Sequence, residues 1–200
     1  MTQHSIKLTY FDEKGRGELS RLLFAYGGVP FVDERVSHAD FPALKPKLPF
    51  GLLPVLEVDG TVYAQSMAIA RYAAKIAGLY PSDPVEALKA NMFSCTLAEL
   101  EGPFVEIVFR TKDETEKAEK IKTFVDETVP KSFGALEKLV QGKFILGDKP
   151  SFADLQLFDL VENNLKMGIP TLSLEAFPKL AAVVINVEAE PKIAAYLAKQ

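Results

Sequence analysis

Residues 53–74, LPVLEVDGTVYAQSMAIARYAA, carry the pattern that decides the fold of the first part of the chain. Val55–Val58 is a short apolar run, and Asp59-Gly60 is a dipeptide typical of a two-residue hairpin turn. Residues 61–63 return as a second strand. From Gln65 onward the apolar side chains recur at helical spacing. The stretch therefore predicts a β-hairpin followed directly by a helix.

The residues before this stretch predict a β-α-β unit. Residues 6–11 alternate in the period of a strand, and Gly15 and Gly17 then break the pattern. A helix follows and stops at Gly27-Gly28, and a second strand is expected over residues 31–35. Two strands joined through a helix are most simply parallel, with a right-handed crossover. The proline-rich residues 41–54 are expected to form a loop without a helix.

The residues after the hairpin predict only helices. Pro81 and Pro84 indicate a domain boundary, so we expect an α/β domain over residues 1–80 and an all-α domain over residues 81–200. The first expected helix covers residues 85–109 and bends at Gly102-Pro103, and the second covers residues 115–140 with a kink at Pro130. Further helices are expected from Ser151, over Pro178–Glu188 and over residues 192–198. Ser151 and Asp154 have the spacing of a capping box at a helix start.

The composition excludes several classes of function. The 200 residues include 23 Lys and Arg against 27 Asp and Glu, and the net charge of −4 argues against a nucleic-acid-binding surface. Cys95 is the single cysteine, which excludes an intramolecular disulfide, a CxxC pair and a cysteine-rich zinc site. Cys95 lies on an apolar helical stripe with Leu88 and Met92, so we expect a packed thiol. We also expect no metal site, no membrane span and a soluble, cytoplasmic protein.

Tyr10 and Arg16 are the first candidates for a binding site. Tyr10 ends the first strand, just before a glycine-containing turn that carries Arg16. Strand ends that face helix starts are where α/β folds place ligand groups, and helix N-termini favour anions. A hydroxyl donor and a cation would then lie beside a negative ligand atom. The alternative is that Tyr10 is only a core residue on an alternating strand.

Two further pairs of residues are candidates for holding a peptide-like ligand. Leu53-Pro54 precedes a strand, and a cis bond there would leave the Leu53 backbone free to pair with a ligand; an ordinary trans turn is the alternative. Gln65-Ser66 combines a side-chain amide, a hydroxyl and a helix N-terminus, which together would bind a carboxylate without metal or lysine. A plain helix cap is the alternative reading of this pair.

Four motifs in order carry a resemblance to a known family. They are KLTYFDEKGRGE at residues 7–18, LPFGLLPVLEVDG at 48–60, QSMAIARYAA at 65–74 and GDKPSFADLQL at 147–157. In these motifs the chain resembles Tyr-type glutathione transferases, and most of all their sigma class, which includes glutathione-dependent prostaglandin D synthase and the S-crystallins. The resemblance implies a thioredoxin-like N-terminal domain, an all-helical C-terminal domain and a homodimer.

The resemblance implies how the sulfur of glutathione would be activated. Tyr10 matches the tyrosine whose hydroxyl hydrogen-bonds the glutathione sulfur, and Arg16 matches the arginine beside the thiolate. A free thiol has a pKa near 8.5, so at neutral pH only a small fraction is nucleophilic. A donor aimed at the sulfur favours the charged form and lowers the thiol pKa.

The resemblance also implies which residues would hold the rest of the tripeptide. Lys45 matches the lysine that holds the glycine carboxylate, and Leu53, before Pro54, matches the residue whose backbone pairs with the cysteinyl part. Gln65 and Ser66 match the pair that holds the γ-glutamyl end. Glutathione is thus implied as a co-substrate, with no permanently bound cofactor.

Three positions depart from the sigma-class pattern. Phe41 stands where Trp is usual, and Leu52 stands where several relatives have Lys. Both changes fall at the glycine end of glutathione, so we expect weaker glutathione affinity with the sulfur chemistry intact. Glu99 is the best match for the acidic residue that relatives supply across the dimer to the γ-glutamyl amine, although Asp is usual there.

The electrophile is expected to bind in an apolar pocket contributed mainly by the helix over residues 85–109. Phe11, Phe104 and Val105 are the candidates, joined by Phe109, and a core or interface role is the alternative for each. The resemblance implies a transferase that conjugates glutathione to small hydrophobic electrophiles. A glutathione-dependent isomerase of the prostaglandin D synthase type and a non-catalytic, crystallin-like relative are the alternatives.

Overall fold

The computed structural model describes residues 4–200; residues 1–3, which open the expected first domain, lie outside the described part. Contacts within the chain separate two compact units. Among the described residues, those up to Tyr80 form the first unit together with Pro191–Gln200, and Pro81–Glu190 forms the second. We expected residues 191–200 in the helical domain, whereas their contacts join them to the first unit. Helical periodicity alone does not tell which unit a terminal helix packs against.

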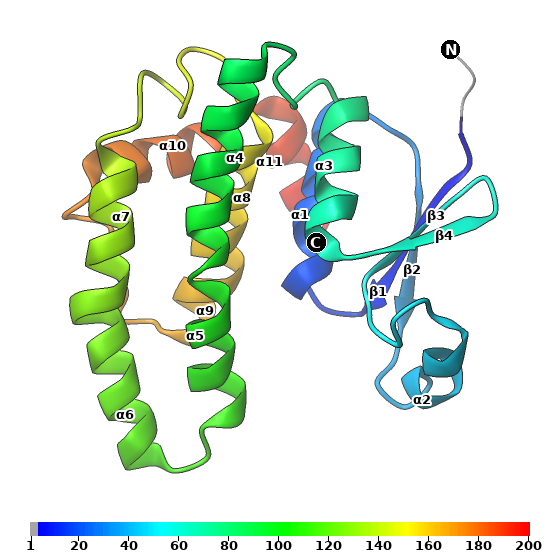
Figure 1. Ribbon diagram of the computed structural model, residues 1–200, viewed down its shortest axis with the longest axis horizontal. Coiled ribbons are helices and arrows are strands. Elements are labelled where there is room, and N and C mark those ends of the chain that lie inside the picture. The colour runs from blue at the N-terminus through cyan, green and yellow to red at the C-terminus, as the bar shows by residue number, and fades with distance from the viewer. Residues whose placement is uncertain (1–3) are drawn as a thin grey trace. The chain divides into compact units, whose positions relative to one another are not determined.

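A four-stranded sheet with the order β2-β1-β3-β4 organises the first unit (Figure 1). Its strands are β1 (Ile6–Phe11), β2 (Val32–Val36), β3 (Val55–Val58) and β4 (Thr61–Ala64). Strands β1 and β2 are parallel, whereas β3 is antiparallel to both β1 and β4. The predicted β-α-β and β-β-α units are therefore confirmed. The hairpin turn also follows the prediction, because Asp59 and Gly60 both have positive φ angles, of 49° and 83°.

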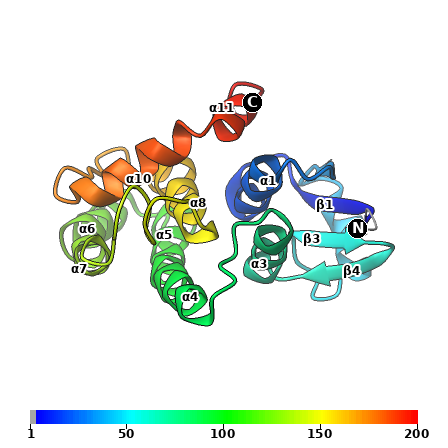
Figure 2. The same cartoon turned by 90° about the horizontal axis from the view of Figure 1, so that it is seen from above.

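Helices α1 (Gly15–Gly27) and α3 (Ser66–Ile76) cover one face of the sheet (Figure 2). Leu8, Thr9 and Tyr10 of β1 are all buried, so both faces of this central strand are covered at that point. Helix α11 (Pro191–Leu197) packs beside α1. Because α1 contacts β1, α3 and α11, every side chain from Leu19 to Phe24 is buried, including polar ones.

The expected loop over residues 41–54 contains a short helix, so that prediction was wrong. Helix α2 (Phe41–Leu44) is followed by a 3₁₀ turn over Lys45–Lys47. Both begin with a proline near the N-terminal end, where the backbone N–H has no intrahelical partner and its absence costs nothing. The prolines therefore start these helical turns instead of preventing them.

The second unit is helical throughout its regular structure (Figure 1). Its helices are α4 (Pro84–Ala98), α5 (Glu101–Val105), α6 (Glu114–Thr123), α7 (Val129–Glu137), α8 (Phe152–Phe158), α9 (Lys166–Gly168) and α10 (Pro178–Glu188). π-helical turns continue three of them, over Glu106–Arg110, Phe124–Thr128 and Asp159–Leu165. The predicted helices are thus present but divided into shorter segments.

Two prolines lie close to the interruptions of these helices. Pro103 has no N–H to donate to the carbonyl of Glu99, and α4 ends at Ala98, five residues before it. Pro130 comes directly after the π-helical turn Phe124–Thr128 and the first residue of α7. A π-helical turn is wider than an α-helical one and accommodates the missing N–H of Pro130, so the kink expected at Pro130 takes the form of a π-helical turn.

The apolar stripe of α4 faces outward, contrary to expectation. Leu88 is 69% exposed, Met92 is 48% exposed, and Cys95 is exposed as well, so the prediction of a packed thiol was wrong. The face that packs inside the unit carries Phe93 and Leu97. Apolar residues occupy most of α4, and the sequence pattern therefore did not distinguish its inner face from its outer face.

The capping box at Ser151 is confirmed. The Ser151 side chain meets the backbone at Asp154, and the Asp154 carboxylate accepts hydrogen bonds from the Ser151 N–H and hydroxyl, each at 2.7 Å. Asp154 also accepts the Ile145 N–H at 2.7 Å, which fixes the preceding loop to the start of α8. Across residues 4–200, no helix is both long and apolar enough to cross a membrane.

Candidate active site

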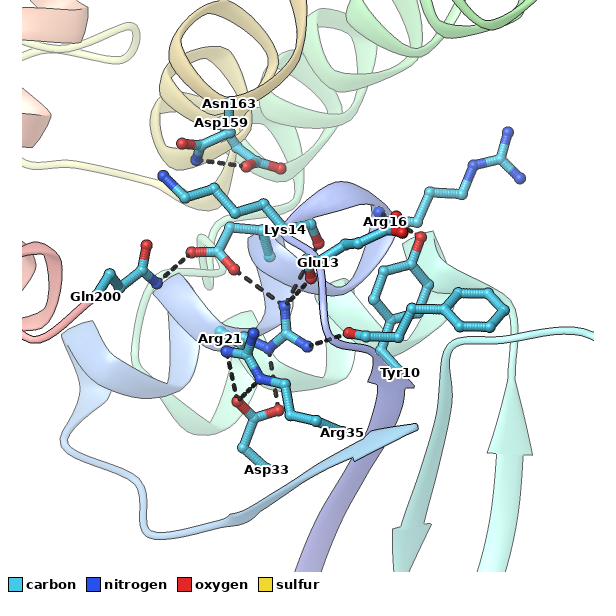
Figure 3. A network of polar contacts seen from close by, with 12 residues as sticks. Tyr10, Glu13, Lys14, Arg16, Arg21, Asp33, Arg35, Asp159, Asn163 and Gln200 are labelled. Atoms are coloured by element: carbon cyan, nitrogen blue, oxygen red, sulfur yellow. Dashed lines mark hydrogen bonds and ion pairs between the residues drawn. The ribbon is translucent and has the colours of Figure 1, made fainter. Parts of the chain in front are cut away.

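Tyr10 lies near the end of β1, with its hydroxyl directed toward the start of α1 (Figure 3). The Tyr10 hydroxyl oxygen accepts the backbone N–H of Arg16 at 3.1 Å. An accepting hydroxyl still has its own proton to donate to another group. In the same view the side chain of Arg16 extends away from the turn.

Two glycines shape the place where the Tyr10 ring lies. A Cβ atom on Gly15 would lie 2.7 Å from the Tyr10 hydroxyl oxygen, and one on Gly17 would lie 2.7 Å from Cδ1 of the ring. Either contact is closer than carbon atoms tolerate without a shift of one partner. The first turn of α1 therefore wraps directly around Tyr10, which requires glycine on both sides of Arg16.

Burial raises the pKa of the Tyr10 hydroxyl above its ordinary value. The hydrogen bond from the Arg16 N–H and the charges of Arg16 and Arg21 oppose this rise, whereas the carboxylate of Glu13 adds to it. Tyr10 is therefore neutral at physiological pH and keeps the proton that a hydrogen-bond donor needs.

A small cleft of about 40 Å³ adjoins Arg16 in the first unit. It is lined by Arg16, Phe50, Leu52, Leu53, Pro54, Ala64, Gln65 and Ser66. The cleft thus brings together five residues that the sequence analysis proposed from separate motifs, between position 16 and position 66. Phe50 and Ala64 were not expected there. Ala64 directly precedes Gln65, and Phe50 lies in the motif at residues 48–60; these positions were the only signals that could have found them.

The backbone around Leu53 has the arrangement that was expected of it. The Leu53-Pro54 peptide bond is cis. The pairing of β3 with its two neighbouring strands begins at Val55, so Leu53 lies just beyond the paired residues. Leu53 also lines the cleft, where its peptide groups are close to any ligand bound there.

The N-terminus of α3 opens at Gln65 and Ser66. Gln65 has a φ angle of 77°, and the first helical hydrogen bonds run from the N–H groups of Ala68 and Ile69 to the Gln65 carbonyl. The N–H groups of Ser66 and Met67 precede these bonds and have no helical acceptor. Together with the Ser66 hydroxyl, they form a site suited to a carboxylate.

Phe41 and Lys45 lie outside the lining of the cleft, on the elements around α2. Phe41 packs edge-on against Phe11, with ring centroids 5.1 Å apart, and Phe11 stacks on His38 at 4.4 Å. A Cβ atom on Gly51 would lie 3.4 Å from Cγ and Cε of Lys45, so the Lys45 stem passes along that backbone. Phe11 also contacts Tyr10 edge-on at 5.5 Å.

The remaining predicted residues belong to the second unit. Phe104 is only 5% exposed, and its ring fills the space above Gly168, where a Cβ atom would lie 2.6 Å from it. Val105 is half-buried, and Phe109 is 72% exposed with its ring centroid 6.2 Å from that of Phe104. Glu99 is exposed just after α4. Among residues 4–200, no group of three or more His, Cys, Asp or Glu side chains is arranged to hold a metal ion.

Sequence reasoning missed the charged residues beneath Tyr10. Glu18 and Arg21 have fully buried side chains in α1 and form an ion pair at 3.1 Å. Charged residues three positions apart on a helix are usually read as an exposed pair. The signal that could have found them is their position among Leu19, Leu22 and Leu23, on a helix with no polar face of its own.

Comparisons with known proteins agree on one family. Residues 98–200 match the family model for the C-terminal domain of glutathione S-transferase, and residues 20–76 match the model for its N-terminal domain. The chain is 35% identical to hematopoietic prostaglandin D synthase of Gallus gallus over 195 residues, covering 97% of this chain and 96% of the relative. It is 36% identical to a glutathione S-transferase of Anopheles gambiae over 200 residues, covering 97% and 96%.

The similar proteins also include an S-crystallin and a protein of known structure. S-crystallin SL11 of Nototodarus sloanii is 34% identical over 202 residues, covering 98% of this chain and 97% of the relative. The structure of prostaglandin synthase D of Nilaparvata lugens superposes with a TM-score of 0.89 at 32% identity, covering 98% of each chain. With its thioredoxin-like sheet, its helical second unit and these relatives over nearly its full length, the chain belongs to the glutathione S-transferase family, among the sigma-class relatives.

Proposed function

We propose that the chain is an active glutathione transferase, which uses Tyr10 to activate the glutathione thiol for attack on small hydrophobic electrophiles. The observation that carries the proposal is the neutral Tyr10 hydroxyl, fixed by the Arg16 N–H at 3.1 Å. It lies in the same unit as a cleft lined by Arg16, Leu53 and Ser66.

In the proposed reaction the thiol of glutathione loses its proton to solvent, and the Tyr10 hydroxyl donates a hydrogen bond to the thiolate. The thiolate sulfur forms a bond to the electrophilic carbon, and the leaving group departs with the electron pair. Lowering the thiol pKa by about two units requires about 2.7 kcal/mol of preferential stabilisation of the thiolate. A charge-assisted hydrogen bond and the nearby Arg16 charge together supply a free energy of this size.

The two ends of glutathione are assigned from the groups around the cleft. The γ-glutamyl carboxylate is proposed to bind the Ser66 hydroxyl and the free N–H groups at the start of α3, with the Gln65 amide beside it. The cysteinyl part pairs with the Leu53 backbone. The glycine carboxylate extends toward Lys45, whose ammonium is the cation on that side.

The helical unit is proposed to supply the electrophile pocket and the dimer contact. Of the three residues of this unit proposed for the electrophile pocket, Val105 and Phe109 are accessible, whereas Phe104 is buried and supports them from within the unit. The exposed apolar face of α4 supports a homodimer, because apolar side chains of this size are rarely left in water over a whole helix face. Glu99, exposed just after α4, is proposed to reach the γ-glutamyl amine of the partner subunit.

Assays of conjugation test the proposal. Purified wild-type protein is mixed with glutathione and an activated aryl halide, alongside Tyr10→Phe and the control Tyr63→Phe, which removes an exposed hydroxyl from β4. We expect Tyr10→Phe to lower kcat/KM about a hundredfold, equivalent to about 2.7 kcal/mol of transition-state stabilisation. Tyr63→Phe should match the wild type. Equal activity in Tyr10→Phe would contradict the role of Tyr10, and an inactive wild type would contradict conjugation.

The isomerase alternative is supported by a specific observation, the 35% identity to a prostaglandin D synthase over nearly the whole chain. It uses the same thiolate and differs only in the electrophile. Formation of prostaglandin D in the presence of glutathione, without consumption of glutathione, would favour the isomerase. An S-crystallin is also similar to this chain, and absence of both activities with intact glutathione binding would favour such a non-catalytic role.

A further inference from the structure

We propose that Arg21 is a positioning residue for Tyr10, and that the segment after Pro191 holds Arg21 in place through Glu18. The inference rests on the proposed function of Tyr10. Neither Glu18 nor Arg21 has any exposed side-chain surface, so neither can contact glutathione. Their effect on the reaction must be transmitted through the turn between β1 and α1 and through the ring of Tyr10.

The Arg21 guanidinium binds the backbone of this turn (Figure 3). It donates to the carbonyl oxygen of Glu13 at 2.8 Å, and at 3.4 Å to those of Lys14 and Phe11. The same guanidinium lies 5.8 Å from the centroid of the Tyr10 ring. One side chain therefore contacts the residues on both sides of the turn and the ring of Tyr10.

The turn needs such a donor because regular structure stops on either side of it. The paired residues of β1 end at Phe11, and α1 begins at Gly15. Carbonyl groups between these points have no strand partner, and buried carbonyls without a donor are costly. The planar, five-donor guanidinium can satisfy several of them in one geometry, which an ammonium group cannot. The position of the Arg16 N–H, and with it the Tyr10 hydroxyl, depends on this turn.

Two carboxylates balance the charge of the buried Arg21. Glu18 Oε2 lies 3.1 Å from one terminal nitrogen, and Asp33 Oδ1 lies 3.0 Å from Nε. The other oxygen of Asp33 binds Arg35. Removal of a buried charge partner leaves an uncompensated ion, so the position of Glu18 determines whether Arg21 stays in its fork geometry.

The second oxygen of Glu18 is bound by residues from the far end of the described chain. Glu18 Oε1 accepts the Tyr196 hydroxyl at 2.9 Å and the Gln200 side-chain amide at 2.8 Å. Burial, with the adjacent Glu18 carboxylate, raises the pKa of Tyr196, so its hydroxyl remains a donor. These contacts span 178 and 182 positions of sequence and lie wholly within the first unit.

The test measures the pKa of the glutathione thiol bound to each variant, from the ultraviolet absorbance of the thiolate as pH is varied, together with kcat and KM. Arg21→Lys keeps the charge but loses the fork of donors. Tyr196→Phe removes one hydroxyl that bonds to Glu18, and Tyr63→Phe is the matched control on β4. Thermal unfolding is recorded for every variant, so that a change in stability is distinguished from a change in the thiol pKa.

We expect Arg21→Lys to raise the bound thiol pKa by about one unit and to lower kcat about tenfold, with the KM for glutathione nearly unchanged. Tyr196→Phe should raise the bound thiol pKa by about half a unit and lower kcat about threefold. Tyr63→Phe should match the wild type. A conservative change that moves the thiol pKa is a result that a purely structural role would not produce.

Two results would overturn the inference, and they can be told apart. If both variants lower the melting temperature but leave the thiol pKa and kcat unchanged, Arg21 and Tyr196 are structural only, and the function of Tyr10 stands. If the wild type itself forms no bound thiolate at neutral pH, the proposed function fails and the inference fails with it. Should Arg21→Lys not fold, Tyr196→Phe alone decides, because it removes only one hydroxyl and its single hydrogen bond to Glu18.

Discussion

At the scale of single residues, the position of Tyr10 depends on two neighbouring glycines that have no Cβ atom. Gly15 and Gly17 leave room for its ring and hydroxyl, and the Arg16 N–H between them bonds to that hydroxyl. Gly17 has an ordinary φ angle, so the requirement for glycine there is one of space and not of backbone conformation. A substitution at Gly17 can therefore displace Tyr10 without straining the backbone, so its effect on activity can be measured apart from its effect on stability.

Gly17→Ala is therefore expected to lower conjugation activity more than stability. The new Cβ atom would meet the Tyr10 ring at 2.7 Å and displace it, whereas alanine is favoured over glycine inside a helix by about 1 kcal/mol. We expect at least a tenfold loss of kcat/KM with a small change in melting temperature. Gly134→Ala in α7 is the control, because its Cβ atom would find its nearest neighbour 4.0 Å away. Equal activity of the two variants would contradict this account.

Phe41 is a second residue with a separable effect. It lies beside Phe11 on α2, on the side where Lys45 is proposed to meet the glycine carboxylate of glutathione. Phe41→Trp adds an indole N–H, and a hydrogen bond to a charged group adds about 1.5–3 kcal/mol. We expect a KM for glutathione at least fivefold lower with kcat unchanged. An unchanged KM in steady-state kinetics would show that this side of the site does not limit affinity.

At the scale of elements, the start of α8 is the most strongly determined local structure. Asp154 accepts three hydrogen bonds, two from Ser151 and one from Ile145, although burial raises its pKa. The sequence predicted the pair Ser151 and Asp154 because a capping box is local. It did not predict Ile145, which reaches Asp154 from the preceding loop.

Asp154→Ala should therefore destabilise the protein more than Ser151→Ala does. Loss of the Ser151 cap costs about 1 kcal/mol. Loss of Asp154 leaves buried donors unsatisfied, at about 1–3 kcal/mol for each. Urea unfolding of both variants measures the difference, and Thr96→Ala on exposed α4 surface serves as a reference for a mild change. Similar midpoints for the two cap variants would show that the Ile145 contact contributes little.

At the scale of the whole molecule, the outward face of α4 determines how copies of the chain are expected to associate. Val85, Leu88 and Met92 are exposed on one helix and follow one another at helical spacing. Burying such a face against a second copy removes apolar surface from water, which contributes a favourable free energy of about 25 cal/mol per Å².

Introducing charge on this face should separate the proposed dimer. We expect Leu88→Glu combined with Met92→Glu to yield monomers in sedimentation experiments, while the wild type sediments as a dimer. Ile185→Glu, which places the same charge on an exposed apolar position of α10, should leave the dimer intact. A wild type that sediments as a monomer, or a double variant that remains dimeric, would show that copies of the chain do not associate through α4.

The sequence by itself determined the succession of the four strands and of the main helices, the Asp59-Gly60 hairpin, the Ser151 capping box and five of the residues that line the cleft. These features depend on residues close together in the chain, or on the four motifs by which the chain resembles glutathione transferases. The tertiary structure alone decided the burial of Glu18 and Arg21, the outward face of α4, and the return of residues 191–200 to the first unit. Each of these depends on which surfaces meet, because the desolvation of a side chain is set by neighbours distant in sequence.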